Sequence, residues 1–152
     1  MKKVPRAGGD IRFLPEVLVA KVMHSECRIA PDDLVERTRL FALSVLTFCR
    51  RLPTTQEAQE AAGQLRRAAN SVRSNYRAAR KGRSRAEFQA KLGTVAEEAD
   101  ESLDWLEYFR DGRIQHDPAL IDEARALTRI FATSVRTARD NTNRSKHRPR
   151  LP

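Results

Sequence analysis

Catalysis and metal binding each need particular residues at particular spacings, and the common patterns of this kind do not occur in the sequence. A two-metal centre in a helical bundle needs Glu-x-x-His on two helices. The three histidines are His24, His116 and His147, and none of them follows a glutamate by three residues. Phosphate-binding loops, dinucleotide-binding turns and zinc-protease helices are also missing. The sequence therefore predicts no catalytic residue, no metal and no cofactor.

Positive charge is the feature that could bind a ligand. The 152 residues include 29 Lys and Arg against 20 Asp and Glu, a net charge of +9. Such an excess favours an anionic partner, most often nucleic acid, although ordinary surface solvation is the competing interpretation. Aromatic residues do not alternate with the basic ones, which argues against strong base stacking. We expect non-specific contacts with RNA or DNA phosphates from Arg50, Arg51, Arg125, Arg129, Arg136, Arg139, Arg144, Lys146 and Arg148.

Four segments have apolar residues at alternating spacings of three and four, and they carry the arginines among these side chains up to Arg139. They predict helices over about 32–52, 54–81, 84–111 and 118–139. Four helices with short connections predict an all-α fold, an up-down-up-down antiparallel four-helix bundle over 32–140. Residues 1–31 are expected to form a flexible, largely irregular N-terminal arm, and 141–152 a disordered basic tail.

Capping signals define the ends of these helices. Thr54–Glu57 and Ser84–Glu87 both have the spacing of a capping box. Asp117 stands directly before a proline and is expected to cap the last helix. Gly82 is expected in the left-handed conformation that commonly ends a helix.

Opposite charges divide between the second and third predicted helices. The segment 54–81 carries six basic residues against two acidic ones, and 84–111 carries eight acidic residues against three basic ones. Because a tight turn joins them, we expect the two helices to lie side by side with complementary charge. The residues predicted to pair between the helices are Arg66, Arg67, Arg73, Arg77, Glu97, Glu98, Glu101 and Asp104.

Three leucines of the first predicted helix lie off its apolar seam. Leu40, Leu43 and Leu46 could belong to a wide core face or to a subunit interface, because exposed apolar patches are rare without a partner. A homo-oligomer interface at these leucines is therefore predicted.

The compartment is predicted from the cysteines and from apolar runs. Cys27 and Cys49 are two lone thiols, which favours a reducing environment. No apolar run approaches the roughly 18 residues that would span a bilayer, and the basic start lacks an apolar segment behind it. A cytoplasmic protein without a membrane partner is expected.

The segment QLRRAANSVRSNYRAARKGRSRAEFQAKLGTVAEEADESLDWLEYF, residues 64–109, resembles a known family. It is similar to the bacterial four helix bundle proteins, also called large-subunit ribosomal RNA intervening-sequence proteins, and the resemblance covers about 35–136. It implies a left-handed bundle, a five-subunit ring and no enzymatic activity. Many members have Asn-Ile-Ala-Glu-Gly where this chain has Asn-Tyr-Arg-Ala-Ala at 75–79, which is typical of a variant branch.

The chain is also similar to the accessory variability proteins of diversity-generating retroelements. That resemblance implies a basic surface that binds nucleic acid, and a reverse transcriptase as partner. Two functions therefore stay open: an oligomeric scaffold that binds RNA or DNA, and an adaptor that binds only another protein.

Overall fold

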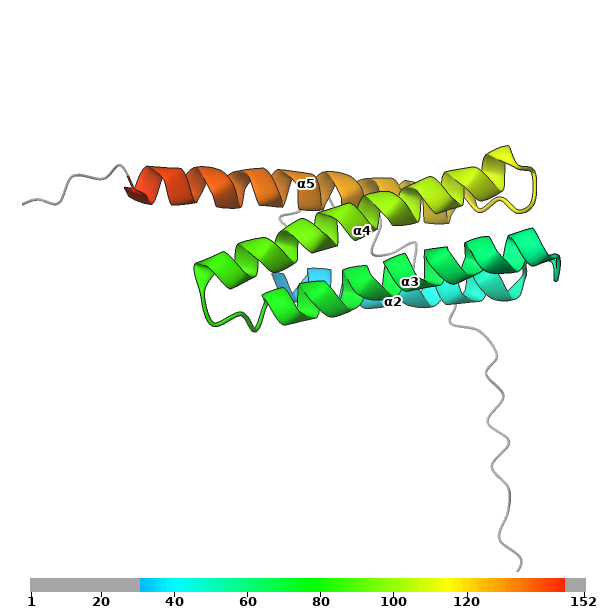
Figure 1. The fold of residues 1–152 in the computed structure, drawn as a ribbon, viewed down its shortest axis with the longest axis horizontal. Helices are drawn as coiled ribbons and strands as arrows, with labels where there is room; N and C mark the ends of the chain where they lie inside the picture. The colour runs from blue at the N-terminus through cyan, green and yellow to red at the C-terminus, as the bar shows by residue number, and fades with distance from the viewer. Residues whose placement is uncertain (1–30, 147–152) are drawn as a thin grey trace, which may run out of the picture.

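The computed structural model describes residues 31–146, apart from the side chains of 31–33, 143, 145 and 146. In this part of the chain the only regular elements are four α-helices (Figure 1). They are α2 (Pro31–Arg50), α3 (Gln56–Ala79), α4 (Arg85–Asp111) and α5 (Pro118–Lys146). The N-terminal arm was expected over residues 1–31, but Pro31 is already part of α2. The rest of that segment lies outside the described residues, as does the end of the expected tail, 147–152.

Each helix runs antiparallel to the one before it and packs against it (Figure 1). α5 also contacts α2, which closes the bundle, so α3 and α5 lie diagonally across it. The α3–α4 turn and the C-terminal end of α5 lie at one end of the bundle, and the other two turns lie at the opposite end. The predicted all-α four-helix bundle is confirmed.

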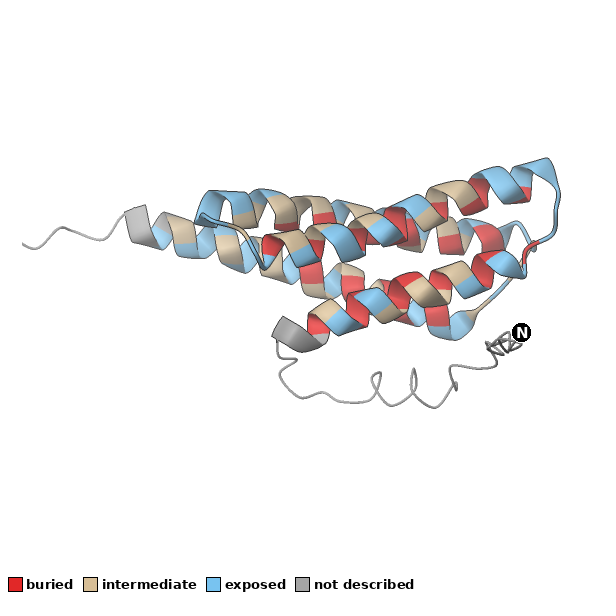
Figure 2. Ribbon diagram, turned by 90° about the horizontal axis from the view of Figure 1, so that it is seen from below, coloured by how far each residue is buried: buried red, intermediate tan, exposed pale blue. Residues whose placement is uncertain are grey.

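The core is built from the apolar seams that the sequence predicts, and the buried residues face inward on every helix (Figure 2). Phe48 of α2 meets Phe109 of α4 edge to face with ring centroids 5.5 Å apart. The ring centroid of Tyr76 on α3 lies 5.2 Å from the ring centroid of Phe131 on α5. Alanines supply much of the buried face of α3, which allows neighbouring helices to approach closely.

A buried ion pair joins α2 to α5. The Arg37 Nε donates to Glu123 Oε1 at 2.7 Å, and Arg37 Nη2 donates to Glu123 Oε2 at 2.8 Å. Each residue is only 8% exposed. Both guanidinium contacts are parallel hydrogen bonds to one carboxylate, the bidentate arrangement in which each charge neutralises the other.

Two of the predicted helix starts have the expected caps. The Ser84 Oγ accepts a hydrogen bond from the Glu87 amide at 3.1 Å, and the Glu87 carboxylate accepts one from the Arg83 amide at 3.0 Å. At the start of α5, Asp117 Oδ1 accepts from the Leu120 amide at 3.1 Å. Both caps satisfy amides that have no partner inside their own helix.

Three details of the helix ends differ from the sequence-based expectation. α3 begins at Gln56, so its N-cap is Thr55, whose side chain makes no capping hydrogen bond, and the capping box at Thr54 is wrong. Gly82 does not have a positive φ. The left-handed conformation falls instead on Arg113, at φ 53°, directly after Gly112.

α5 is longer than expected and continues through residues 141–146 of the expected tail. The extra length packs on α4, where Gln89 Nε2 donates to the Ala138 carbonyl at 2.6 Å and to Thr142 Oγ1 at 2.7 Å. These contacts and the absence of proline before Pro149 explain why the helix does not end at Arg139.

Candidate functional site

Four arginines of α5 form a row on its exposed side. Arg129, Arg136 and Arg139 are spaced by seven and three residues, so they share one helix face, and Arg144 follows near the end of the helix. All four are exposed, and none of them pairs with a carboxylate among the residues that the structure describes. We call them the α5 arginine row. Their charge is available to an external anion.

Two other predicted phosphate contacts are already engaged with carboxylates. Arg51 Nη2 lies 3.0 Å from Asp117 Oδ2. Arg125 bridges two acids: its Nη2 lies 2.9 Å from Glu107 Oε1 and its Nη1 lies 3.0 Å from Asp122 Oδ1. A phosphate at either guanidinium would have to compete with these carboxylates, which weakens the expected contribution of both residues.

The remaining predicted contacts are more scattered. Arg50 is exposed at the end of α2, at the opposite end of the bundle from Arg144. Lys146 is the last residue of α5, but its side chain is not described. Arg148 lies outside the described residues. Of the predicted contacts, the structure therefore brings together the four members of the α5 arginine row.

The predicted charge pairing between α3 and α4 does not occur as direct contacts. The two helices do pack side by side. Among the described residues, however, none of the eight side chains predicted to pair forms an ion pair across this interface. Six are exposed to solvent, and only Arg66 and Glu98 are half-buried. Arg67 donates to Gln64 of its own helix, and Glu101 accepts from Trp105 of its own helix.

The direction in which the α3 arginines point explains this result. Arg66 lies close enough to Cys49 of α2 to act on its thiol: burial raises the pKa of Cys49, and the charge and hydrogen bond of Arg66 partly offset the rise. Arg73 and Arg77 follow Arg66 by seven and eleven residues and share its helix face. This face is therefore turned toward α2 and solvent, away from α4.

Charge is instead divided along the length of the molecule. Between Arg66 and Ala96, nine residues are basic and one is acidic, whereas between Glu97 and Asp111 seven are acidic and one is basic. α4 runs from the α3–α4 turn to the other end of the bundle (Figure 1). The end with the α3–α4 turn and Arg144 is thus basic, and the end with Asp111 and Asp117 is largely acidic. The electrostatic potential at the basic end therefore favours anions over cations.

The three leucines predicted to form an interface are half-buried on α2. Leu40, Leu43 and Leu46 do not belong to the buried core cluster or to the side chains packed against it. Near them, the Arg39 guanidinium hydrogen-bonds Glu36 and lowers the pKa of that exposed carboxyl. The outer side of α2 therefore combines apolar and charged residues.

Metal ligation and membrane insertion are two further properties that the described residues can be compared with. They contain no group of three or more His, Cys, Asp or Glu side chains that could hold a metal ion. None of the four helices combines the length and the apolar character that a membrane span requires.

Sequence reasoning missed the Arg37–Glu123 pair, although a signal was present. Arg37 follows Leu34 by three residues and precedes Phe41 by four. Glu123 stands in the same position between Leu120 and Leu127. A charged residue between two core positions on each of two helices indicates a buried pair, because an unpaired buried charge would be too costly.

Comparisons with known proteins agree with this fold. A family model described as 23S rRNA-intervening sequence protein matches residues 32–130, more than half of the chain. A solved structure of a protein with unknown function, from the S23 ribosomal protein family of Bacteroides thetaiotaomicron, superposes with a TM-score of 0.61 at 23% identity. The match covers 70% of this chain and 99% of that one, and at this identity it concerns the fold alone. No curated protein matches the chain.

Proposed function

Because the chain belongs to the 23S rRNA-intervening sequence protein family, we propose that it is a non-enzymatic bundle that binds RNA through its basic surface. The observation that carries the proposal is the α5 arginine row, four exposed guanidinium groups on one helix without a carboxylate partner among the described residues. Guanidinium groups bind phosphate oxygens in a bidentate manner and stay charged at every physiological pH. The proposed compartment is the cytoplasm.

Binding is expected to depend on the phosphate backbone and not on base sequence. The arginine row contains no aromatic side chain on which a base could stack. Contacts with phosphates position a protein on nucleic acid without reading its sequence. RNA is the preferred ligand because of the family, and DNA should compete for the same guanidinium groups.

Filter binding of labelled RNA over a series of salt concentrations tests this function. Each phosphate contact contributes about 0.7–0.9 to the slope of log affinity against log salt, so retention at low salt should be lost steeply as salt rises. The variant Arg136→Gln/Arg139→Gln should weaken binding and reduce the slope by about 1.4–1.8.

The matched control is Arg51→Gln/Arg125→Gln, which removes the same charge from arginines that already pair with carboxylates. It should change affinity less than the α5 variant does. If the wild-type protein retains no RNA at low salt, the proposed function is wrong.

Association of several copies is part of the proposal. The half-buried Leu40, Leu43 and Leu46 offer an apolar surface on α2 outside the core, and the family resemblance implies a pentamer. Leu43→Glu should place a charge in that interface and reduce the assembly to monomers in light scattering. A wild-type monomer at micromolar concentration would rule out the association.

An adaptor that binds only a protein is the second candidate, and the same α2 leucines favour it. The reverse transcriptase implied by the resemblance is the first partner to test. A pull-down from the native host, with and without nuclease, separates the two functions. A protein that stays bound after nuclease treatment, together with no RNA retention, would favour the adaptor.

A further inference from the structure

The outer face of α3 and the turn that follows it form a second basic surface. We define the α3 basic surface as Arg67, Arg73, Arg77, Arg80 and Lys81, which are all exposed. The sequence contains no acidic residue between Glu60 and Glu87. Arg67, Arg73 and Arg77 pair with no carboxylate among the described residues, contrary to their expected role in holding α4.

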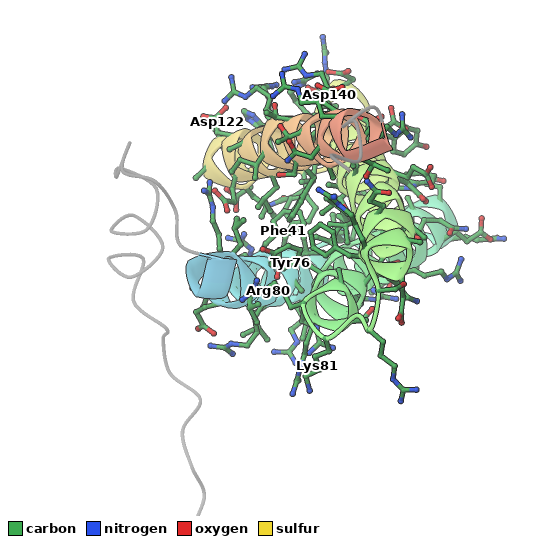
Figure 3. All side chains as sticks on the ribbon, turned by 90° about the vertical axis from the view of Figure 1, so that its left-hand side faces the viewer. Phe41, Tyr76, Arg80, Lys81, Asp122 and Asp140 are labelled. Atoms are coloured by element: carbon green, nitrogen blue, oxygen red, sulfur yellow. The ribbon has the colours of Figure 1, made fainter. Side chains whose placement is uncertain are left out.

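This surface and the α5 arginine row lie on different sides of the same end of the bundle. α3 and α5 are diagonal, and Lys81 lies on the side away from α5 (Figure 3). Along the axis the two regions coincide, because Gln89, near the start of α4, contacts Ala138 and Thr142 of α5. The two surfaces therefore lie at the same level along the bundle axis.

The α3–α4 turn leads from the α3 basic surface to the start of α4, and α4 packs against α5. An open hollow of about 440 Å³ lies at the turn, and its lining includes Arg80, Arg83, Ser84 and Arg85. Glu87 is the acidic residue nearest in sequence, and its carboxylate accepts a hydrogen bond from the Arg83 amide as part of the α4 cap. The turn thus continues the positive charge from α3 to the start of α4.

We infer that the α3 basic surface is a second RNA-contact surface, and that one RNA molecule passes from it around the α3–α4 turn to the α5 arginine row. The inference rests on the proposed function and extends it to a surface that the sequence had assigned to helix pairing. The ligand group is the phosphodiester backbone, because the α3 basic surface consists of guanidinium and ammonium groups.

The geometry gives the expected size of the contact. From Arg67 to the end of α3 at Ala79 the helix rises about 18 Å, at about 1.5 Å per residue. The α3 basic surface has five basic residues and the α5 arginine row has four. If all of them contact phosphates, the slope of log affinity against log salt should have a magnitude of about 6–8. The α5 arginine row alone would give a slope of about 3–4.

Two triple variants with the same change in charge test the inference by filter binding. They are Arg67→Gln/Arg73→Gln/Arg77→Gln on α3 and Arg129→Gln/Arg136→Gln/Arg139→Gln on α5, and all six side chains are exposed. Each variant should reduce the salt slope by about 2–3 and weaken binding of a long RNA. A control on α4, Glu97→Gln/Asp104→Asn, should not reduce affinity. Circular dichroism verifies that each variant is folded.

The outcomes separate this inference from the proposed function. If the α3 variant binds RNA with the wild-type slope while the α5 variant is impaired, the inference is overturned and the proposed function stands. If wild-type protein binds no RNA, the proposed function itself fails. Equal losses in the two variants support a path that uses both surfaces. A further substitution, Arg73→Glu, should enlarge the α3 effect by adding repulsion.

Discussion

Between α2 and α5, a guanidinium and a carboxylate are buried against each other, whereas the opposite charges of α3 and α4 lie mainly on outer surfaces. Arg37 and Glu123 are 86 residues apart in sequence and meet in two hydrogen bonds of 2.7 and 2.8 Å. Arg73 and Glu97 belong to adjacent, packed helices and are both exposed. Contact between charges therefore depends on the helix face that carries them, and net helix charge does not predict it.

The two interfaces are accordingly held by different forces. The α3 side of the α3–α4 contact consists largely of alanines and other apolar side chains, whose burial and dispersion contacts stabilise it. The α2–α5 contact includes a desolvated ion pair, whose value depends on both partners being present. Removing one charge should therefore matter greatly at α2–α5 and little at α3–α4.

The largest effect is expected from Glu123→Ala. The variant leaves the Arg37 guanidinium buried without its carboxylate, so the free energy of unfolding should fall by about 3–5 kcal/mol. Urea denaturation followed by circular dichroism measures the change. The exposed pair of Glu36 and Arg39 provides the control, because Glu36→Ala should cost less than about 1 kcal/mol.

A double variant sharpens the same test. Arg37→Met/Glu123→Leu removes both charges and keeps similar volume, so its stability should return close to that of the wild type or exceed it. If Glu123→Ala lowers the free energy of unfolding no more than Glu36→Ala does, the buried ion pair is not important for stability.

A smaller effect is expected when the close packing of α3 is disturbed. Ala68 is 1% exposed, and Ala68→Leu inserts a larger side chain that should reduce the free energy of unfolding by about 1–3 kcal/mol. Ala90 on α4 is exposed, and the same substitution there should have little effect because alanine and leucine have similar helix propensity. Equal stability of the two variants would show that α3 is loosely packed.

The smallest effect on stability is expected when two α4 carboxylates that the sequence pairs with α3 are neutralised. Glu97 and Asp104 are exposed and form no ion pair among the described residues. Glu97→Gln/Asp104→Asn should therefore change the free energy of unfolding by less than about 0.5 kcal/mol. Thermal melts at low and high salt provide the measurement. A clear loss at low salt that disappears at high salt would restore the charge-pairing hypothesis.

Helix existence and core positions could be read from the sequence because both depend on local spacing. Leu34, Phe41 and Phe48 recur at intervals of seven, and all three are buried as expected. Caps were predicted where the side chain and the amide are three residues apart, as at Ser84 and Glu87. Helix ends were less certain: α5 extends beyond Arg139 because Thr142 finds a partner on α4.

The candidate site was predictable only in part. The exposed arginines of α5 share a face by their spacing alone, so Arg129, Arg136 and Arg139 could be grouped in advance. Two ion pairs could not be predicted in this way, Arg51 with Asp117 and Arg125 with Glu107. Each of them joins segments that only the fold brings together. Such pairs decide which cations stay available to an external phosphate.

By itself, the sequence determined four amphipathic helices, their order and the division of charge along the chain, since these follow from residue type and a period of 3.6. Only the tertiary structure decided which charged faces meet. Rotation of α3 about its own axis turns its arginines toward α2 and solvent, and the packing of α5 against α2 buries Glu123 beside Arg37. Such rotations depend on contacts between all four helices, which local patterns do not contain.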